Sequence, residues 1–83
     1  MDQAAILAEV AEAIRQTFRR PNAVISRETT ALDIDGWDSL SHTGLMLDLE
    51  ERFGMQFPPE RMFDLADVGE LVDLIQAVKN GNG

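Results

Sequence analysis

The chain has 83 residues, 45% of them hydrophobic, no cysteine, and a formal net charge of −8 at pH 7. This length suits one small domain without a deep active site, and the lack of cysteine excludes disulfides, thiolate metal sites and a cysteine nucleophile. Residues 28–73 hold twelve acids and two arginines, which argues against nucleic acid as a partner and favours basic protein surfaces.

Residues 3–18 predict an amphipathic helix that ends before Pro21, because proline cannot continue a helix. Its main apolar positions recur at spacings of three and four, at Leu7, Val10, Ile14 and Phe18. The start of the chain is not basic and its apolar run is short, so we expect no signal peptide. No segment is long and apolar enough to cross a membrane, so we expect a cytoplasmic protein without a membrane partner.

Residues 21–37 predict a long first loop, because turn-forming and capping residues occur throughout it. We expect four apolar side chains to hold this loop across the bundle, namely Val24, Ile25, Leu32 and Ile34. The acidic stretch at residues 33–38 superficially resembles a calcium loop. Counting from Asp33, however, glycine falls at position four and Gly44 occupies position twelve, where a calcium loop needs glycine at six and glutamate at twelve. We therefore expect a solvated loop without a metal.

Residues 39–53 predict a second helix, capped by Asp38 or Ser39 and stopped by Gly54. On a helical wheel, one face gathers the apolar residues expected in the core, namely Leu45, Met46, Leu49 and Phe53. The opposite face carries Leu40 and Leu47, with Thr43, Gly44, Glu51 and, at its edge, Glu50. A second apolar face favours contact with another molecule; scattered surface leucines are the alternative interpretation.

The last third of the chain contains three predicted segments, of which the first two are short. Residues 56–59 form an extended linker, and residues 60–65 suffice for a short helical turn or two. Asp67 and Glu70 give a capping-box-like start to a last helix over residues 68–79.

The pattern as a whole predicts an all-α fold with four helices, of which the third is short, and a long first loop. We expect residues 1–83 to form a single domain, with a core at about residues 3–78 and a flexible tail at residues 79–83.

Ser39 stands where the first loop becomes the second helix, between Asp38 and Leu40. A hydroxyl at this point is exposed, and the N–H groups and dipole of a helix start favour an attached phosphate. Ser39 and His42 could suggest a hydrolase, but the sequence has no G-x-S-x-G turn and nothing that builds an oxyanion hole. We expect no catalytic residue.

Three residues near Ser39 each have two interpretations. His42 is either a partly buried histidine at the rim of the bundle, hydrogen-bonded to the long loop, or a contact for a partner or substrate. Trp37 either anchors the end of the long loop or offers an aromatic contact beside the serine. Gly44 either allows close approach by a partner or prosthetic arm or is neutral variation, at a cost near ~1 kcal/mol relative to alanine.

Almost the whole chain, about residues 3–78, resembles the acyl carrier protein family. The resemblance rests on Asp38-Ser39-Leu40, at the start of a helix that ends Leu49-Glu50-Glu51-Arg52-Phe53-Gly54. It continues through Phe57-Pro58, the short third segment, and Val68 to Ile75. It implies an antiparallel four-helix bundle with a short third helix.

The resemblance also implies a function without catalysis or a metal site. The family's motif serine corresponds to Ser39, to which a phosphopantetheinyl transferase would transfer 4′-phosphopantetheine from coenzyme A. The thiol of this cofactor would hold acyl groups as thioesters and deliver them to acyl-loading, condensing or acyl-transfer enzymes with basic docking patches. The positions that such partners read correspond to Asp38, Leu40, Leu47, Glu50 and Glu51. We expect the carrier to be a monomer.

Three departures from the family pattern indicate a discrete carrier of a specialised pathway. Trp37 is larger than usual in housekeeping fatty-acid carriers, Gly44 replaces a usual acid, and Ser41-His42-Thr43 is less acidic than expected. Fatty-acid and polyketide synthesis, aminoacyl or hydroxyacyl carriage, and lipid modification all remain open. The competing hypotheses are an unmodified acidic helical protein-interaction module and, supported only by Ser39 and His42, an enzyme.

Overall fold

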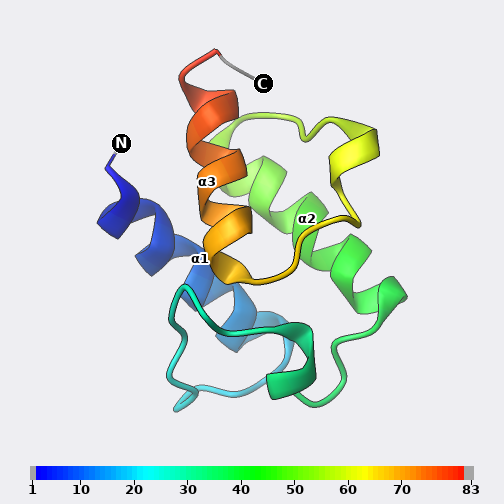
Figure 1. The fold of residues 1–83 in the computed structure, drawn as a ribbon. Coiled ribbons are helices and arrows are strands. Elements are labelled where there is room, and N and C mark those ends of the chain that lie inside the picture. The colour runs from blue at the N-terminus through cyan, green and yellow to red at the C-terminus, as the bar shows by residue number, and fades with distance from the viewer. Residues whose placement is uncertain (1, 82–83) are drawn as a thin grey trace.

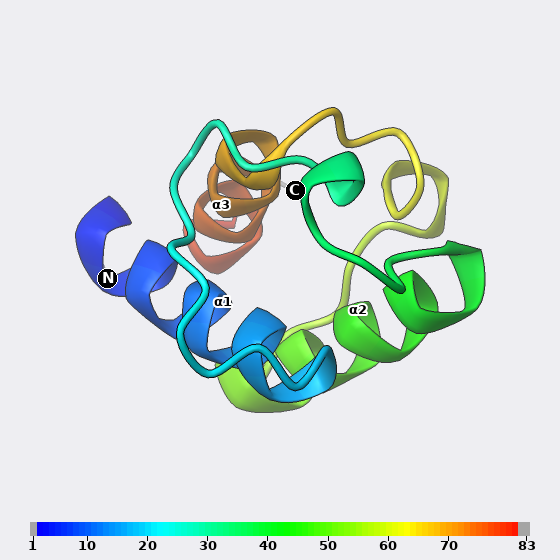
Figure 2. The same cartoon turned by 90° about the horizontal axis from the view of Figure 1, so that it is seen from below.

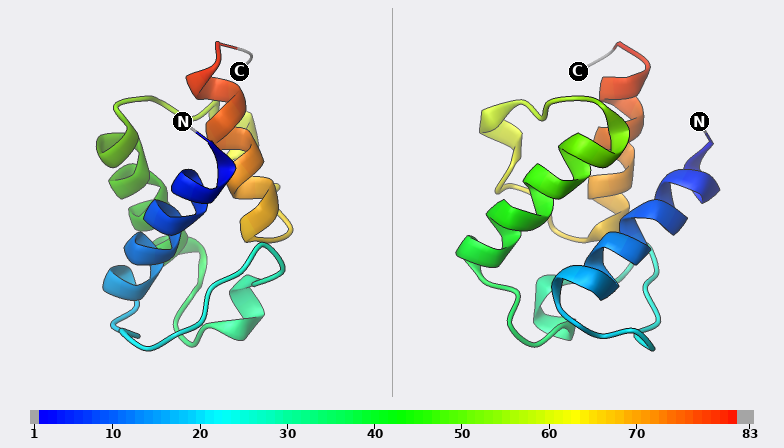
Figure 3. Two further views of the ribbon diagram at one scale, coloured as in Figure 1. Left: turned by 90° about the vertical axis from the view of Figure 1, so that its left-hand side faces the viewer. Right: turned by 180° about the vertical axis from the view of Figure 1, so that it is seen from behind.

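The structure, a computed structural model, describes residues 2–81 and is all-α, as predicted (Figure 1). The elements in chain order are α1 (Gln3–Thr17), the 3-10 turn η1 (Ala31–Asp33), α2 (Ser39–Phe53), the 3-10 turn η2 (Pro59–Arg61) and α3 (Val68–Lys79). In both views of Figure 3, α1 runs down the molecule while α2 and α3 run up it. Within residues 2–81 no helix has the length and hydropathy needed to span a membrane.

The short third helix that the sequence predicts over residues 60–65 is a single 3-10 turn at Pro59–Arg61. Its bonds run from the Arg61 N–H to the Pro58 carbonyl and from the Met62 N–H to the Pro59 carbonyl, at 2.9 and 3.3 Å. The two prolines lack N–H groups and have restricted φ, so they favour a short turn over a regular helix. The element therefore keeps its predicted place in the fold and is shorter than expected.

Side chains and glycine set the ends of the three α-helices close to where the sequence predicts them. Asp38 caps α2 and Asp67 caps α3, each by accepting a hydrogen bond from the N–H three residues later, at 2.9 Å. Asp2 caps α1 in the same way. Gly54 ends α2 in the left-handed conformation, with φ of 63°. The tail residues 82 and 83 lie outside the described residues.

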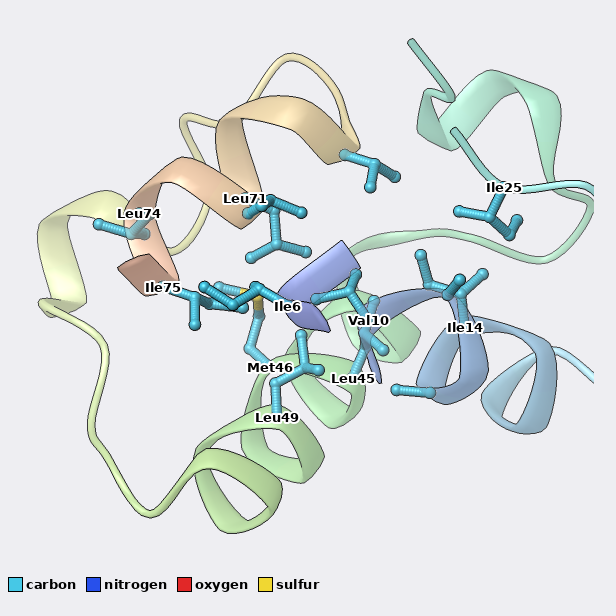
Figure 4. Packing of buried hydrophobic residues seen from close by; sticks show 14 of the residues in the cluster. Ile6, Val10, Ile14, Ile25, Leu45, Met46, Leu49, Leu71, Leu74 and Ile75 are labelled. Atoms are coloured by element: carbon cyan, nitrogen blue, oxygen red, sulfur yellow. The ribbon is translucent and has the colours of Figure 1, made fainter. Parts of the chain in front are cut away.

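The core lies where the apolar faces of the three helices meet (Figure 4). α2 contributes the four residues that the helical wheel predicts, all buried: Leu45, Met46, Leu49 and Phe53. On α1 the buried face is rotated slightly from the prediction, because Ile6 is fully buried while Leu7 and Phe18 are only partly covered. The last helix adds Leu71, Val72 and Ile75. α1 packs against both other helices.

The first loop crosses one end of the bundle past the start of α3 (Figure 2). Ile25 and Ile34 are buried as predicted, but the prediction is wrong for Val24 and Leu32, which are 89% and 97% exposed. Backbone hydrogen bonds, and not these two side chains, hold the loop. The Val68 N–H donates to the Thr29 carbonyl at 2.9 Å, and the Gly69 N–H donates to the Arg27 carbonyl at 2.8 Å.

Candidate functional site

Ser39 is the first residue of α2 and is exposed at the end of the bundle crossed by the first loop. The capping role belongs to Asp38: its carboxylate accepts from the Ser41 N–H, and its own N–H donates to the Ser41 hydroxyl, both at 2.9 Å. The Ser41 hydroxyl in turn donates to the Gly36 carbonyl at 2.7 Å. The Ser41 hydroxyl is therefore used in hydrogen bonds to the end of the first loop. The Ser39 hydroxyl is not needed to start the helix.

Asp38 brings a negative charge to this position. The hydrogen bond from the Ser41 N–H stabilises the carboxylate and lowers the pKa of Asp38 below its usual range. Asp38 is therefore ionised at neutral pH directly beside Ser39.

Ser39 borders an open cleft of about 270 Å³. The other lining residues are Ala31, Trp37, Asp38, His42, Phe63 and Leu65. They come from the first loop, the first turn of α2 and the segment after η2, three parts of the chain that the sequence alone does not bring together. Aromatic rings and a carboxylate thus share the space beside one exposed hydroxyl.

His42 connects two of these segments with both ring nitrogens. The Trp37 indole N–H donates to His42 Nδ1 at 3.0 Å, and His42 Nε2 lies 2.6 Å from the Met62 carbonyl oxygen. An indole only donates and a carbonyl only accepts, so this geometry fits a neutral ring with its proton on Nε2. The interpretation of His42 as a partly buried rim residue bonded to the long loop is confirmed, and the bond to Met62 is an addition.

A row of rings crosses the same end of the bundle. The ring centroids of Phe18 and Trp37 lie 5.2 Å apart, those of Trp37 and His42 lie 6.1 Å apart, and those of His42 and Phe63 lie 5.4 Å apart. Trp37 is partly buried and packs against the core. This confirms its interpretation as the anchor of the loop's end, and it also lines the cleft.

The outer face of α2 is exposed as the wheel predicts, with Leu40 84% and Leu47 56% exposed. Glu51 is exposed, and a Cβ added to Gly44 would meet no atom within 4 Å. Glu50 differs, because its carboxylate accepts a hydrogen bond from the Phe57 N–H at 2.8 Å. Four of the five predicted recognition residues are therefore exposed, and Glu50 also stabilises the linker after α2.

Sequence reasoning missed Phe63 as part of this surface. It is 62% exposed, lines the cleft and contacts His42. The segment 60–65 has too few residues for a periodic pattern, so nothing in it indicates which apolar side chains face outward. Among the described residues, no group of three or more His, Cys, Asp or Glu side chains is arranged to hold a metal ion.

Comparisons with known proteins cover nearly all of the chain. The profile of the family described as "Phosphopantetheine attachment site" matches residues 7–75. The chain is 33% identical over 70 residues to the acyl carrier protein of Acidothermus cellulolyticus, which covers 84% of this chain and 83% of that protein. It is 30% identical over 80 residues to the meromycolate extension acyl carrier protein of Mycobacterium leprae, covering 96% of this chain and 70% of that protein.

The fold is also similar to a solved structure. The solution structure of a holo acyl carrier protein from Geobacter metallireducens matches with a TM-score of 0.79 and 38% identity. The match covers 93% of this chain and 92% of that chain.

Proposed function

Because the chain belongs to the acyl carrier protein family, whose prosthetic group is covalently attached 4′-phosphopantetheine, we propose that the Ser39 hydroxyl is the attachment point in this protein. The protein is a carrier in fatty-acid or related biosynthesis. The observation that carries the assignment of Ser39 is its position as an exposed hydroxyl at the start of α2, beside a cleft and inside the matched range.

The residues at this position fit a phosphodiester. N–H groups at a helix start lack partners within the helix, and they and the helix dipole favour a phosphate there. The chain has two other serines, Ser26 and Ser41. The Ser26 hydroxyl accepts from the Glu28 N–H within the first loop, and the Ser41 hydroxyl bonds to Asp38 and Gly36. Ser39 is the serine whose modification disturbs the fold least.

The attachment step needs an external transferase and coenzyme A. The Ser39 oxygen would bond to phosphorus as its proton leaves, the phosphoanhydride bond of coenzyme A would break, and adenosine 3′,5′-bisphosphate would be released. When bound, the group supplies a terminal thiol that holds acyl groups as thioesters. The chain's own residues present this thiol to partner enzymes and raise its local concentration there, and none of them acts as a catalyst.

Members of this family interact with biosynthetic enzymes, and we assign that contact to the exposed face of α2. Leu40 and Leu47 supply apolar area, while Asp38 and Glu51 supply charge beside it. A partner surface that combines basic and apolar side chains complements this face. We propose such docking patches on the phosphopantetheinyl transferase and on acyl-loading, condensing or acyl-transfer enzymes. The carrier acts as a monomer in the cytoplasm, without nucleic acid or membrane as a partner.

Intact-mass spectrometry tests the assignment of Ser39. The protein is incubated with coenzyme A, magnesium and a broad-specificity phosphopantetheinyl transferase. Wild type and the matched control Ser26→Ala, a serine of the first loop outside α2, should gain the mass of one phosphopantetheine, and Ser39→Ala should gain none. Because Ser39 does not cap α2, Ser39→Ala should keep its helical circular dichroism spectrum. If folded wild type gained no mass, the chain would instead be the unmodified interaction module; if Ser39→Ala still gained it, Ser39 would be the wrong residue.

A further inference from the structure

Two hollows meet at His42. The outer one is the open cleft of about 270 Å³ beside Ser39. The inner one is more enclosed and measures about 50 Å³; it reaches toward the core through Val68 and Leu71 of α3. Trp37, His42 and Leu65 line both hollows, together with Ala31. Anything attached beside Ser39 that entered the core by this route would have to pass these side chains.

The side chains between the hollows are fixed by hydrogen bonds and stacking. Trp37 bonds to His42, and His42 bonds to the Met62 carbonyl, so one bridge links the end of the first loop, α2 and the segment after η2. Phe18 also stacks on Trp37. Opening the bridge would leave an indole N–H and a carbonyl without partners in a partly buried site, which is unfavourable unless new partners replace them.

We propose that the Trp37–His42–Met62 bridge keeps the acyl chain out of the core, so that this carrier holds its cargo in the outer cleft and takes short acyl groups. The inference rests on attachment at Ser39. The inner hollow of about 50 Å³ compares with the cavity of about 150 Å³ that admits a single benzene ring. The outer cleft is open to solvent and mixes polar with apolar side chains, so a long alkyl chain there would stay partly in water and would gain less from burial than it would in the core.

A chain-length series tests this on the wild-type protein. The transferase is used to load Ser39 from butanoyl- and octanoyl-coenzyme A, and intact mass confirms one acyl arm per protein before any further measurement. An octanoyl chain buried in the folded state would stabilise that state, because it buries four more methylene groups than butanoyl. We expect the melting temperatures of the two forms to agree within about 1 °C, whereas burial would raise that of the octanoyl form by more than about 5 °C. A rise of that size would overturn the proposal.

Trp37 supplies a second readout, because it is the only tryptophan of the chain and forms part of the bridge. Its fluorescence emission should be the same in the butanoyl and octanoyl forms of the wild type. A shift in the octanoyl form alone would mean that the chain displaces the bridge, and this too would overturn the proposal.

His42→Ala removes the bridge and enlarges the passage. In this variant the octanoyl form should melt at a higher temperature than the butanoyl form and should show altered Trp37 emission. Val24→Ala, a change at an exposed loop position, is the matched control and should behave as wild type. If His42→Ala does not fold, the wild-type series still decides whether the acyl chain enters the core. A protein that gains no arm at all contradicts the assignment of Ser39, whereas a loaded protein stabilised by octanoyl contradicts only the role of His42.

Discussion

Ser39 and Ser41 lie two residues apart at the start of α2, yet their hydroxyls have different surroundings. Ser41 takes part in a reciprocal cap with Asp38 and bonds to the Gly36 carbonyl, so its removal affects the helix start. Ser39 takes no part in this cap and borders the cleft. Sequence reasoning could propose Ser39 because the rules of helix capping and phosphate binding are local. The neighbours of His42 could not be predicted in the same way, because Met62 lies twenty residues further along the chain.

Substitutions at Glu50 and Glu51 should have different effects, one on the stability of the fold and the other on recognition by the transferase. Glu50→Ala removes the acceptor for the Phe57 N–H and should lower the free energy of unfolding by about 1–2 kcal/mol. Glu51→Ala removes an exposed charge and should leave stability within about 0.5 kcal/mol of wild type while lowering kcat/KM for transferase loading. Urea denaturation and mass-detected loading rates measure the two effects. Destabilisation by Glu51→Ala alone would show that the contacts of the two glutamates are misassigned.

Backbone hydrogen bonds hold the first loop to the start of α3. The N–H groups at the start of α3 donate to the Thr29 and Arg27 carbonyls, which partly replaces the hydrogen bonds that a helix start lacks. Arg27 also bonds to both carboxylate oxygens of Asp73, at 3.1 and 2.9 Å, and thereby lowers the pKa of Asp73. Because this ion pair is about half exposed, it contributes little to stability, and the backbone bonds are the main link.

Gly69 allows the first loop to approach α3 closely. Gly44, which has open space around it, serves as the control. A Cβ at Gly69 would lie 3.1 Å from the Arg27 carbonyl oxygen and 3.2 Å from the Arg27 side chain, so the loop would have to move. Gly69→Ala should therefore lower the free energy of unfolding by about 1–2 kcal/mol, although alanine is the better helix former. Gly44→Ala, with open space around the new methyl group, should raise it by about 1 kcal/mol.

Denaturant titration of both glycine variants measures whether the free energy of unfolding falls for Gly69→Ala and rises for Gly44→Ala. Equal stabilisation by the two substitutions would mean that the first loop does not contact α3 closely at Gly69. If Gly44→Ala stabilises the fold but slows transferase loading, the bare backbone at Gly44 serves close approach by a partner. Unchanged loading would favour the interpretation of Gly44 as neutral variation.

The helices could be predicted from the sequence, but the loop contacts could not. α2 has a regular apolar period and clear caps, so its bounds and its four core residues follow from local rules. The first loop has no period, and hydrophobicity alone wrongly assigned Val24 and Leu32 to the core. Its path depends on backbone hydrogen bonds to α3, more than thirty residues away, and such bonds leave no signal in residue type. Phe63 and the cleft escaped prediction for the same reason.

At the scale of the whole molecule, charge has opposite effects on folding and on docking. The formal net charge is −8, and residues 28–73, which include α2 and the cleft, hold twelve acids against two arginines. Like charges crowded on a small domain repel one another and destabilise the compact state, while the same charges attract a basic partner. Salt weakens both effects, since the screening length falls from about 10 Å at 0.1 M to about 3 Å at 1 M.

Raising sodium chloride from 0.05 to 0.5 M should therefore raise the melting temperature of the carrier and lower kcat/KM for loading by the transferase by about tenfold or more. The Ser26→Ala variant, in which no charge changes and α2 is untouched, should show the same salt dependence as wild type. Glu51→Ala should show a weaker one, because one docking charge is gone. If loading were insensitive to salt while the melting temperature still rose, the acids would serve only solubility, and the apolar residues Leu40 and Leu47 would carry recognition alone.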